Sequence, residues 1–373
     1  MKNYLLLACL FPAVLFAQNT YTVCNAVGIK ANYRTLQGAI DSVSAGSTLY
    51  VFPSDNSYGG VTINKKLTIL GTGFMLDQNV TPATTPNTNG AKLMYIHFLQ
   101  GSDYSYIEGL QLNEVTGPGN PSVTYRLFLD SGVANINITR CWTSIWPDFR
   151  AGNTIIVARS TINCSINESF LYCFGYNTNH SSGNFFYEAG EGSQNLQISN
   201  NIIIGPDGCG MNYLLSSAYY GNLYFTNNTF FVNLSVSFFS NYTYVNNFFI
   251  NSDTTYAVPA SIGLNGNTCH NNITNAPNLF GTNSLNIQNV NPDSVFVYSI
   301  FGYHSFDEKW KVRSNNFAKT YASDGGEVGA YGGYDPYKLS GLSRLPYIYD
   351  LTVSKDSAVR GNIKIHIKAK ANN

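Results

Sequence analysis

Apolar residues occur in this chain mostly as short runs with a period of two, and Gly, Pro and Asn separate the runs. That pattern predicts short β-strands joined by tight bends. One early segment differs, because Leu36, Ala39 and Ile40 have helical spacing and Thr35 can cap the start. We therefore expect one short amphipathic helix over residues 36–43. The strands expected after it are 48–52, 61–63 and 67–70.

A self-similar unit then recurs at intervals of about 20 to 30 residues, which is typical of a solenoid. Each copy has a strand of period two, a polar corner rich in Asn, and a second apolar strand. No copy can bury its inward face alone, so neighbouring copies must stack as parallel coils. The seven copies are residues 106–110, 136–140, 165–170, 196–202, 223–230, 242–248 and 269–273.

The asparagine pairs at these corners have a structural interpretation. A tight bend needs a residue that tolerates φ > 0, and Asn does so better than other residues that carry a side chain. The side-chain amides of stacked corners can also hydrogen-bond to one another along the stack. We therefore predict that the pairs belong to the scaffold, with ligand binding as the alternative. The clearest pairs are Asn200-Asn201, Asn227-Asn228, Asn246-Asn247 and Asn271-Asn272.

Both ends of the chain resemble a known superfamily. Residues 33–41, continuing through 61–71, are similar to the opening of pectin-lyase-like β-helix proteins, in which a capping helix leads into the first coils. Residues 276–280, 311–318 and 323–333 resemble the ending of β-helix proteins exported by Bacteroidetes-type bacteria. The resemblance implies an all-β, right-handed parallel β-helix. It leaves the activity open, because the superfamily contains lyases, hydrolases, esterases and proteins without known chemistry.

The first 17 residues predict export. Lys2 precedes a short apolar run from Tyr4 to Phe16, and Ala17 suits a cleavage site before Gln18. We expect a secreted, extracellular or outer-surface protein, with the periplasm as an alternative. No later run is long enough to span a membrane. Charged residues make up 11% of the chain and the net charge is zero, which argues against a nucleic-acid partner.

The expected domains are a signal peptide at 1–17, a β-helix at 18–335 and a C-terminal tail at 336–373. In the tail, residues 347–353 and 363–369 predict two strands of a hairpin, with lysines alternating along the second. Sorting or surface attachment is the alternative role for this tail. Six cysteines follow the predicted cleavage site and none forms a CxxC pair, so disulfides and buried free thiols both stay open.

The residues of known chemistries are missing from this sequence. Calcium sites of uronate lyases need several carboxylates, and glycoside hydrolases need a pair of them. Here Asp307-Glu308 is the single adjacent acidic pair, and the histidines have no metal-binding spacing. The superfamily's catalytic residues therefore cannot be transferred to any position, and we expect no metal and no cofactor.

A modest group of ionisable and aromatic residues in the middle coils, with Arg140 and Glu168 among its charges, is the one candidate site. Scattered solvated charges and core aromatics are its simpler explanation. The leading hypothesis is a protein without an evident catalytic site that displays a glycan-binding or adhesive face. The rival is a polysaccharide lyase or glycoside hydrolase, and the oligomeric state stays open. The catalytic candidates are Asp148, His180, Glu188 and Glu191, the last two expected in one Gly-containing loop, and the ligand-binding candidates are Trp142, Trp146, Arg150, Tyr187 and Asp207.

Overall fold

A computed structural model describes most of the chain after the predicted signal peptide. The described residues are 19–76, 89–112, 125–145, 153–158, 163–173, 184–189, 195–210, 223–234, 242–252, 266–283, 285–299, 307–344, 346–355 and 363–370. No helix among them is long and apolar enough to cross a membrane.

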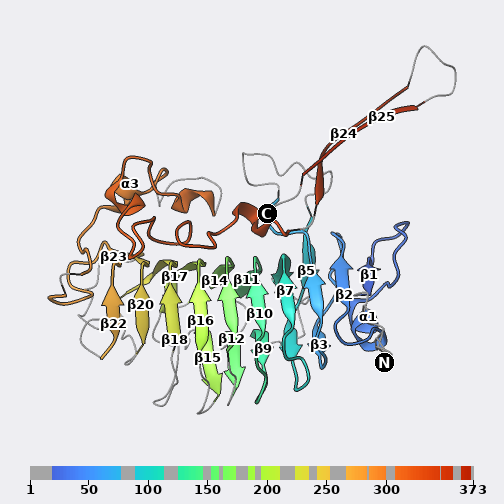
Figure 1. Ribbon diagram of the computed structural model, residues 1–373, viewed down its shortest axis with the longest axis horizontal. Helices are drawn as coiled ribbons and strands as arrows, with labels where there is room; N and C mark the ends of the chain where they lie inside the picture. Colours follow the sequence, from blue (N-terminus) through green and yellow to red (C-terminus); the bar gives the residue numbers. More distant parts are fainter. Residues whose placement is uncertain are drawn as a thin grey trace, which may run out of the picture.

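The described chain is a right-handed parallel β-helix with three sheets, and the coils follow one another along the long axis of the molecule (Figure 1). Sheet A contains β1 (Thr20–Val23), β2 (Thr48–Val51), β4 (Thr68–Leu70), β7 (Tyr106–Glu108), β10 (Asn137–Thr139), β13 (Ser165–Asn167), β16 (Leu196–Ser199), β18 (Leu223–Thr226), β20 (Thr243–Val245) and β22 (Thr268–His270). Sheet B contains β3 (Val61–Ile63), β6 (Ile96–Phe98), β9 (Tyr125–Leu129), β12 (Asn153–Ala158) and β15 (Asn184–Ala189). Sheet C contains β5 (Ala91–Leu93), β8 (Leu110–Leu112), β11 (Trp142–Ile145), β14 (Phe170–Cys173), β17 (Ile202–Gly210), β19 (Thr229–Asn233), β21 (Phe248–Asn251) and β23 (Ile273–Thr274).

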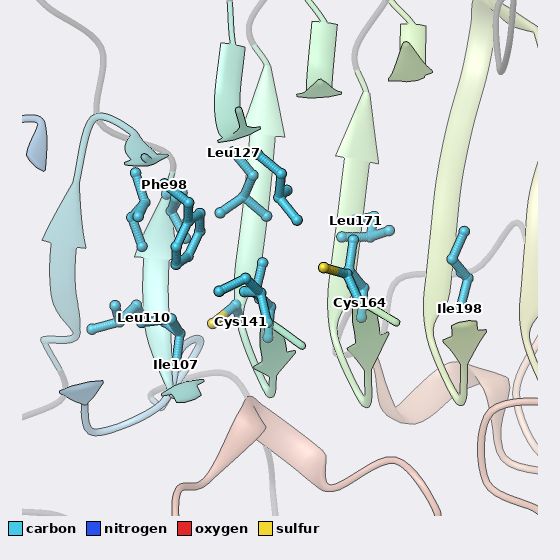
Figure 2. Close-up of a cluster of buried hydrophobic side chains, with 14 of the residues drawn as sticks. Phe98, Ile107, Leu110, Leu127, Cys141, Cys164, Leu171 and Ile198 are labelled. Atoms are coloured by element: carbon cyan, nitrogen blue, oxygen red, sulfur yellow. The ribbon is translucent and has the colours of Figure 1, made fainter. Parts of the chain in front are cut away.

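The predicted stacking is confirmed. The seven aligned segments supply β7, β10, β13, β16, β18, β20 and β22, which are consecutive neighbours in sheet A. Their central residues are in register and buried, so that Ile107, Ile138 and Ile166 form part of one continuous column. Figure 2 shows side chains from the sheets meeting in this core. Each coil therefore completes its neighbour's hydrophobic core.

The capping helix is also confirmed. It is α1 (Leu36–Ser42), and the Thr35 hydroxyl accepts a hydrogen bond from the Gly38 amide at 3.2 Å. Its apolar side, which includes Leu36, Ala39 and Ile40, is fully buried against the first coils. The helix thus covers the end of a core that would otherwise face water.

The asparagine corners lie between sheets A and C and behave as predicted. The first residue of each pair has a positive φ, for example 57° at Asn200 and 59° at Asn246. The second residue is buried, and its amide group donates to the next coil. Asn201, Asn228, Asn247, Asn272 and Asn286 form this ladder, with Nδ2 to Oδ1 distances of 2.8–3.1 Å. Each ladder oxygen also accepts from the backbone amide of the preceding coil, so every corner is tied to the next.

After β23 the chain turns back along the stack instead of adding strands to the three sheets. We call residues 292–344 the return segment; Figure 1 shows it, in orange and red, running along one side of the coils. It contains α3 (Pro292–Val295) and the 3₁₀ turns η2 (Glu308–Trp310), η3 (Phe317–Lys319) and η4 (Leu339–Gly341). Its apolar side chains, including Phe296, Trp310 and Val328, pack on the outer face of sheet C.

Polar contacts fix the return segment to the corner asparagines. The Asn200 amide donates to the carbonyls of Ala330 and Gly332, and Asn271 donates to the Tyr321 carbonyl. Asn246 exchanges hydrogen bonds with Ser323. The left-handed corner residues therefore have a second role, because their side chains hold the chain that covers sheet C.

The cysteines and the tail complete the description. Cys24, Cys141, Cys164 and Cys269 are buried as thiols, which confirms the free-thiol alternative for these four (Figure 2 shows Cys141 and Cys164 in the core). Burial raises the pKa of Cys141 to about 12. The two predicted tail strands are present as β24 (Tyr347–Lys355) and β25 (Ile363–Lys370), an antiparallel pair that projects from the body in Figure 1.

Candidate functional site

The structure describes four of the nine residues proposed from the sequence. Tyr187 and Glu188 lie in β15 of sheet B, and Trp142 and Asp207 lie in β11 and β17 of sheet C. Trp146, Asp148, Arg150, His180 and Glu191 lie outside the described residues. The described four are therefore divided between two sheets.

Two expectations about the middle coils need correction. Glu188 was expected in a loop, but it belongs to β15, where its strand pairs with β12. Arg140 and Glu168 were expected among the charges of an exposed site, but both are buried at the corner between sheets A and C. The Arg140 guanidinium contacts Glu168 at 2.8 Å and Glu108 at 3.1 Å. This ion-pair triad is structural, since it lies under the return segment.

Trp142 also has a packing role in this structure. Its ring lies 6.2 Å from that of Phe74 at a tilt of 48°, within the apolar cluster between sheet C and the return segment. Its strand neighbour Phe170 is fully buried in the same cluster. Trp142 is therefore a poor candidate for contacting a ligand.

A different group of side chains stands on the outer face of sheet B. We call Tyr95, His97, Tyr125 and Phe128 the aromatic strip. The His97 ring stacks on Phe128, with centroids 4.5 Å apart and planes 15° apart. Tyr125 packs edge-on against Tyr95 at 5.5 Å and lies 5.1 Å from Phe128. Each of the four is half-buried, so part of each side chain faces solvent.

Strand alternation produces this strip. In β6, Ile96 and Phe98 are fully buried in the core, so the intervening His97 points outward. In β9, Leu127 and Leu129 are buried inward and Phe128 points outward, in register with His97. Alternation therefore accounts for the outward positions of His97 and Phe128, and Tyr95 and Tyr125 complete the strip at the beginnings of the two strands.

Gly60 makes room for the first ring. A Cβ atom added at this position would lie 2.1 Å from Cε1 of Tyr95, much closer than two carbon atoms can approach. The Tyr95 ring therefore lies directly over the glycine backbone. Any side chain at position 60 would displace this ring from the strip.

Asp130 follows β9 and is the acidic neighbour of the strip. Its Oδ2 is 3.7 Å from Nε2 of His97, and its side chain is 40% exposed. Burial lowers the pKa of His97 below its usual value, while the Asp130 carboxylate opposes that change. Burial raises the pKa of Tyr125, and Tyr95 and Asp130 add to that effect. At neutral pH the strip therefore carries uncharged rings beside one carboxylate.

The strip continues in register toward two of the residues proposed from the sequence. Thr62, His97, Phe128, Ile156 and Tyr187 occupy matching positions on the five strands of sheet B. Glu188 is in register with Val157 and with the buried Leu129. Tyr187 is thus in register with Phe128 and His97, and Glu188 with Leu129.

The strip could not be found from sequence motifs, because His97 has no histidine or carboxylate near it in the sequence. The available signal was the alternation itself, since the segments Ile96-His97-Phe98 and Leu127-Phe128-Leu129 place one aromatic ring outward on each strand. Within the part of the chain that the structure describes, no group of three or more His, Cys, Asp and Glu side chains could hold a metal ion.

Comparison with known proteins finds no matching protein-family model and no matching curated protein. Among solved structures, the chain is similar to an alginate lyase from Paenibacillus sp. str. FPU-7, with a TM-score of 0.35, 14% identity, and coverage of 68% of this chain and 92% of that chain. It is also similar to DFA-IIIase from Arthrobacter chlorophenolicus A6 without its lid, with a TM-score of 0.33, 12% identity, and coverage of 64% and 72%. The same enzyme in complex with GF2 gives a TM-score of 0.34 and 11% identity. The strand pairing described above, rather than these scores, establishes the fold.

Proposed function

We propose that this chain is an exported protein that binds glycans along the outer face of sheet B. The observation that carries the proposal is the aromatic strip, in which partly exposed rings from adjacent strands pack together beside one carboxylate. Contiguous exposed apolar surface rimmed by polar groups often marks a binding site on a protein.

The chemistry of sugars matches this surface. One face of a pyranose ring is apolar, and it can lie on an aromatic ring while the equatorial hydroxyl groups reach polar neighbours. Asp130 supplies an exposed acceptor for such hydroxyls. Neighbouring strands are about 4.8 Å apart, which is comparable to the advance of one sugar along an extended glycan. A chain that runs along the helix axis would therefore meet successive strands.

A solution experiment tests this site directly. We expect the purified chain to bind members of a glycan array, and we expect Phe128→Ala and Gly60→Ala to weaken that binding at least tenfold. Gly60→Ala is informative because it displaces Tyr95 without removing any aromatic group. The matched control is Tyr224→Ala, which removes an outward tyrosine from sheet A. Equal losses in all three variants, or no binding by the native chain, would refute the proposal.

Export is the second part of the proposal and rests on the pattern of residues 1–17. Expression of the full chain in a Gram-negative host should give a mature protein that begins at Gln18. N-terminal sequencing of the extracellular and periplasmic fractions checks this. Retention of the intact N-terminus in the cytoplasm would contradict it.

A polysaccharide-active enzyme is the alternative function. It is favoured by one observation: Asp130, which follows β9, places a 40% exposed carboxylate beside the aromatic strip. Reducing-sugar and unsaturated-uronate assays on the glycans that bind distinguish the two functions. Binding without turnover supports the binding protein. Turnover that is lost in Glu188→Gln or Asp130→Asn supports the enzyme.

A further inference from the structure

We infer that the projecting hairpin, formed by β24 and β25, is a docking arm that binds an anionic lipid surface. This interaction is separate from glycan binding at sheet B. Three observations carry it. The hairpin extends away from the coils, its second strand alternates isoleucine with basic residues, and its net charge is opposite to that of the rest of the chain.

The hairpin forms a two-stranded sheet of its own. Its strands pair antiparallel at eight register positions and extend away from the body of the molecule in Figure 1. A two-stranded hairpin by itself is at best marginally stable in water, because it cannot bury an apolar face. A surface that covers one face of the hairpin would therefore also stabilise it.

The described part of β25 exposes large aliphatic side chains. Ile365 and Ile367 are 59% and 55% exposed. They are in register with Val353 and Leu351 of β24, so apolar residues of both strands occupy the same register positions. Because side chains alternate between the two faces of a strand, the exposed Lys368 lies on the face opposite to the isoleucines. The strand is thus amphipathic along its described length.

Charge is distributed unevenly between the hairpin and the body. Residues 347–373 contain five Lys or Arg and two Asp, which gives a net charge of +3, whereas the whole chain has a net charge of zero. Residues 1–346 therefore carry a net charge of −3. Attraction between exposed charges falls off within about 8 Å at physiological salt. A cationic arm that projects from the body lets positive charge approach an anionic surface before the acidic body does.

An anionic lipid surface fits both properties of β25. Segments that lie on membranes combine apolar side chains, which enter the boundary between headgroups and acyl chains, with Lys or Arg that attract anionic headgroups. A nucleic acid would engage the lysines but would leave Ile365 and Ile367 in water. A second copy of the hairpin could cover the isoleucines, but it would bring two net charges of +3 together. The lipid surface is therefore the occupant that uses both properties.

Vesicle flotation of the full mature chain tests this docking. The vesicles contain phosphatidylcholine alone, or an equimolar mixture of phosphatidylcholine and phosphatidylglycerol. We expect the chain to bind the mixed vesicles about tenfold more strongly than the phosphatidylcholine vesicles. Binding to the mixed vesicles should weaken as the salt concentration rises, because salt screens the attraction of the lysines.

Two double substitutions in the hairpin separate its two contributions. Lys364→Gln with Lys370→Gln removes two charges at positions in register with uncharged residues, and it should weaken binding to the mixed vesicles roughly tenfold. Ile365→Ser with Ile367→Ser removes the exposed aliphatic side chains. It should weaken binding by a similar factor and leave the remaining binding more sensitive to salt.

The matched controls lie on the body of the protein. Val27→Ser with Ile29→Ser removes two aliphatic side chains that are 97% and 45% exposed, and Lys30→Gln with Lys66→Gln removes two exposed lysines. Neither should change vesicle binding. Equal binding to both kinds of vesicle, equal losses in hairpin and control variants, or no binding by the native chain would overturn the inference. A dimer in analytical ultracentrifugation that dissociates in the isoleucine variant would overturn it too, because the occupant would then be a second copy.

Discussion

Sheets A and C are built from the same coils, yet their outer faces are opposite in character. Outward positions of sheet A are mostly polar, as at Asn137, Ser165 and Gln197, which are in register on neighbouring strands. The equivalent outer column of sheet C includes Phe170 and Ile202, both fully buried. The difference is the return segment, which covers sheet C and leaves sheet A open.

This contrast shows how the sequences of the strands in a solenoid indicate whether another segment covers the outer face of a sheet. A strand with one buried face alternates apolar and polar residues, as sheet A does. A strand buried on both faces has a continuous apolar run, and Phe170-Leu171-Tyr172, Ile202-Ile203-Ile204 and Phe248-Phe249-Ile250 have that form. The continuous apolar run in the second strand of each repeat therefore predicts that another segment of the chain packs on its outer face.

The largest expected effect comes from removing the return segment. A chain that ends at Asn291 retains every strand of the three sheets but exposes the outer face of sheet C. We expect it to aggregate or to lose its cooperative thermal transition, because a broad apolar surface would face water. The control chain ends at Pro346 and lacks only the projecting hairpin, whose strands pair with each other. If both truncated chains have the same thermal unfolding transition as the full protein, the return segment is not needed for stability.

A smaller effect is expected from replacing one side chain at the outer face of each sheet, either the one that packs on sheet C or one that belongs to sheet A. Trp310 is 1% exposed and packs against Phe231 and Phe296, with centroids 5.3 and 5.5 Å away. Trp310→Ala should lower the free energy of unfolding by about 4 kcal/mol. Tyr224→Ala, on the half-exposed outer face of sheet A, should cost about 1 kcal/mol or less. Denaturant unfolding measures both, and similar losses would contradict the contrast between the sheets.

The third test concerns the corner where the two sheets and the return segment meet. The Arg140 guanidinium pairs with Glu108 and Glu168 and donates to the Leu342 carbonyl at 3.1 Å, while the Arg344 amide donates to Glu108. Arg140→Met should lower the free energy of unfolding by about 3 kcal/mol at pH 7, because two buried carboxylates lose their partner. Arg313→Met, at an exposed arginine, is the control.

The loss of stability in Arg140→Met should depend on pH in a defined direction. Burial already raises the pKa of Glu168 in the folded chain, and the Arg140 charge opposes that rise. Without Arg140 the folded state binds protons more readily than the unfolded state, whose glutamates titrate near about 4.3. The free energy of unfolding of Arg140→Met should therefore be closest to that of the native chain at low pH. The difference should grow as the pH rises through the raised pKa of Glu168. A deficit that stays constant from pH 4 to pH 8 would show that packing, not charge, causes it.

Much of the fold could be predicted from local patterns. The helix at Leu36, the stacking of seven segments and the asparagine ladder each follow from spacing within about 30 residues. The course of residues 292–344 could not be predicted in the same way, since it depends on contacts with coils far away in the sequence. The Asn246–Ser323 contact is an example, because neither residue has a local reason to be paired with the other.

The candidate site was less accessible to sequence reasoning. Searching for ionisable groups led to Arg140 and Glu168, whose charges serve the interior. These two side chains form internal ion pairs because they are buried, and their burial depends on the return segment that covers them. The strip around His97 lacked any sequence motif, because His97 and Phe128 meet through strand register and the two tyrosines join them at the beginnings of the strands. Tyr187 is the one described candidate that shares the strip's register.

The return segment reaches the beginning of the molecule. The Phe74 amide donates to the Ser340 carbonyl at 2.7 Å, and the Ser340 hydroxyl donates to the Met75 carbonyl. In a simple solenoid each unit needs only its neighbours and can form as it is synthesised. Here an early coil is completed by a residue 265 positions later in the sequence, so its flank stays uncovered until that distant segment folds back onto it.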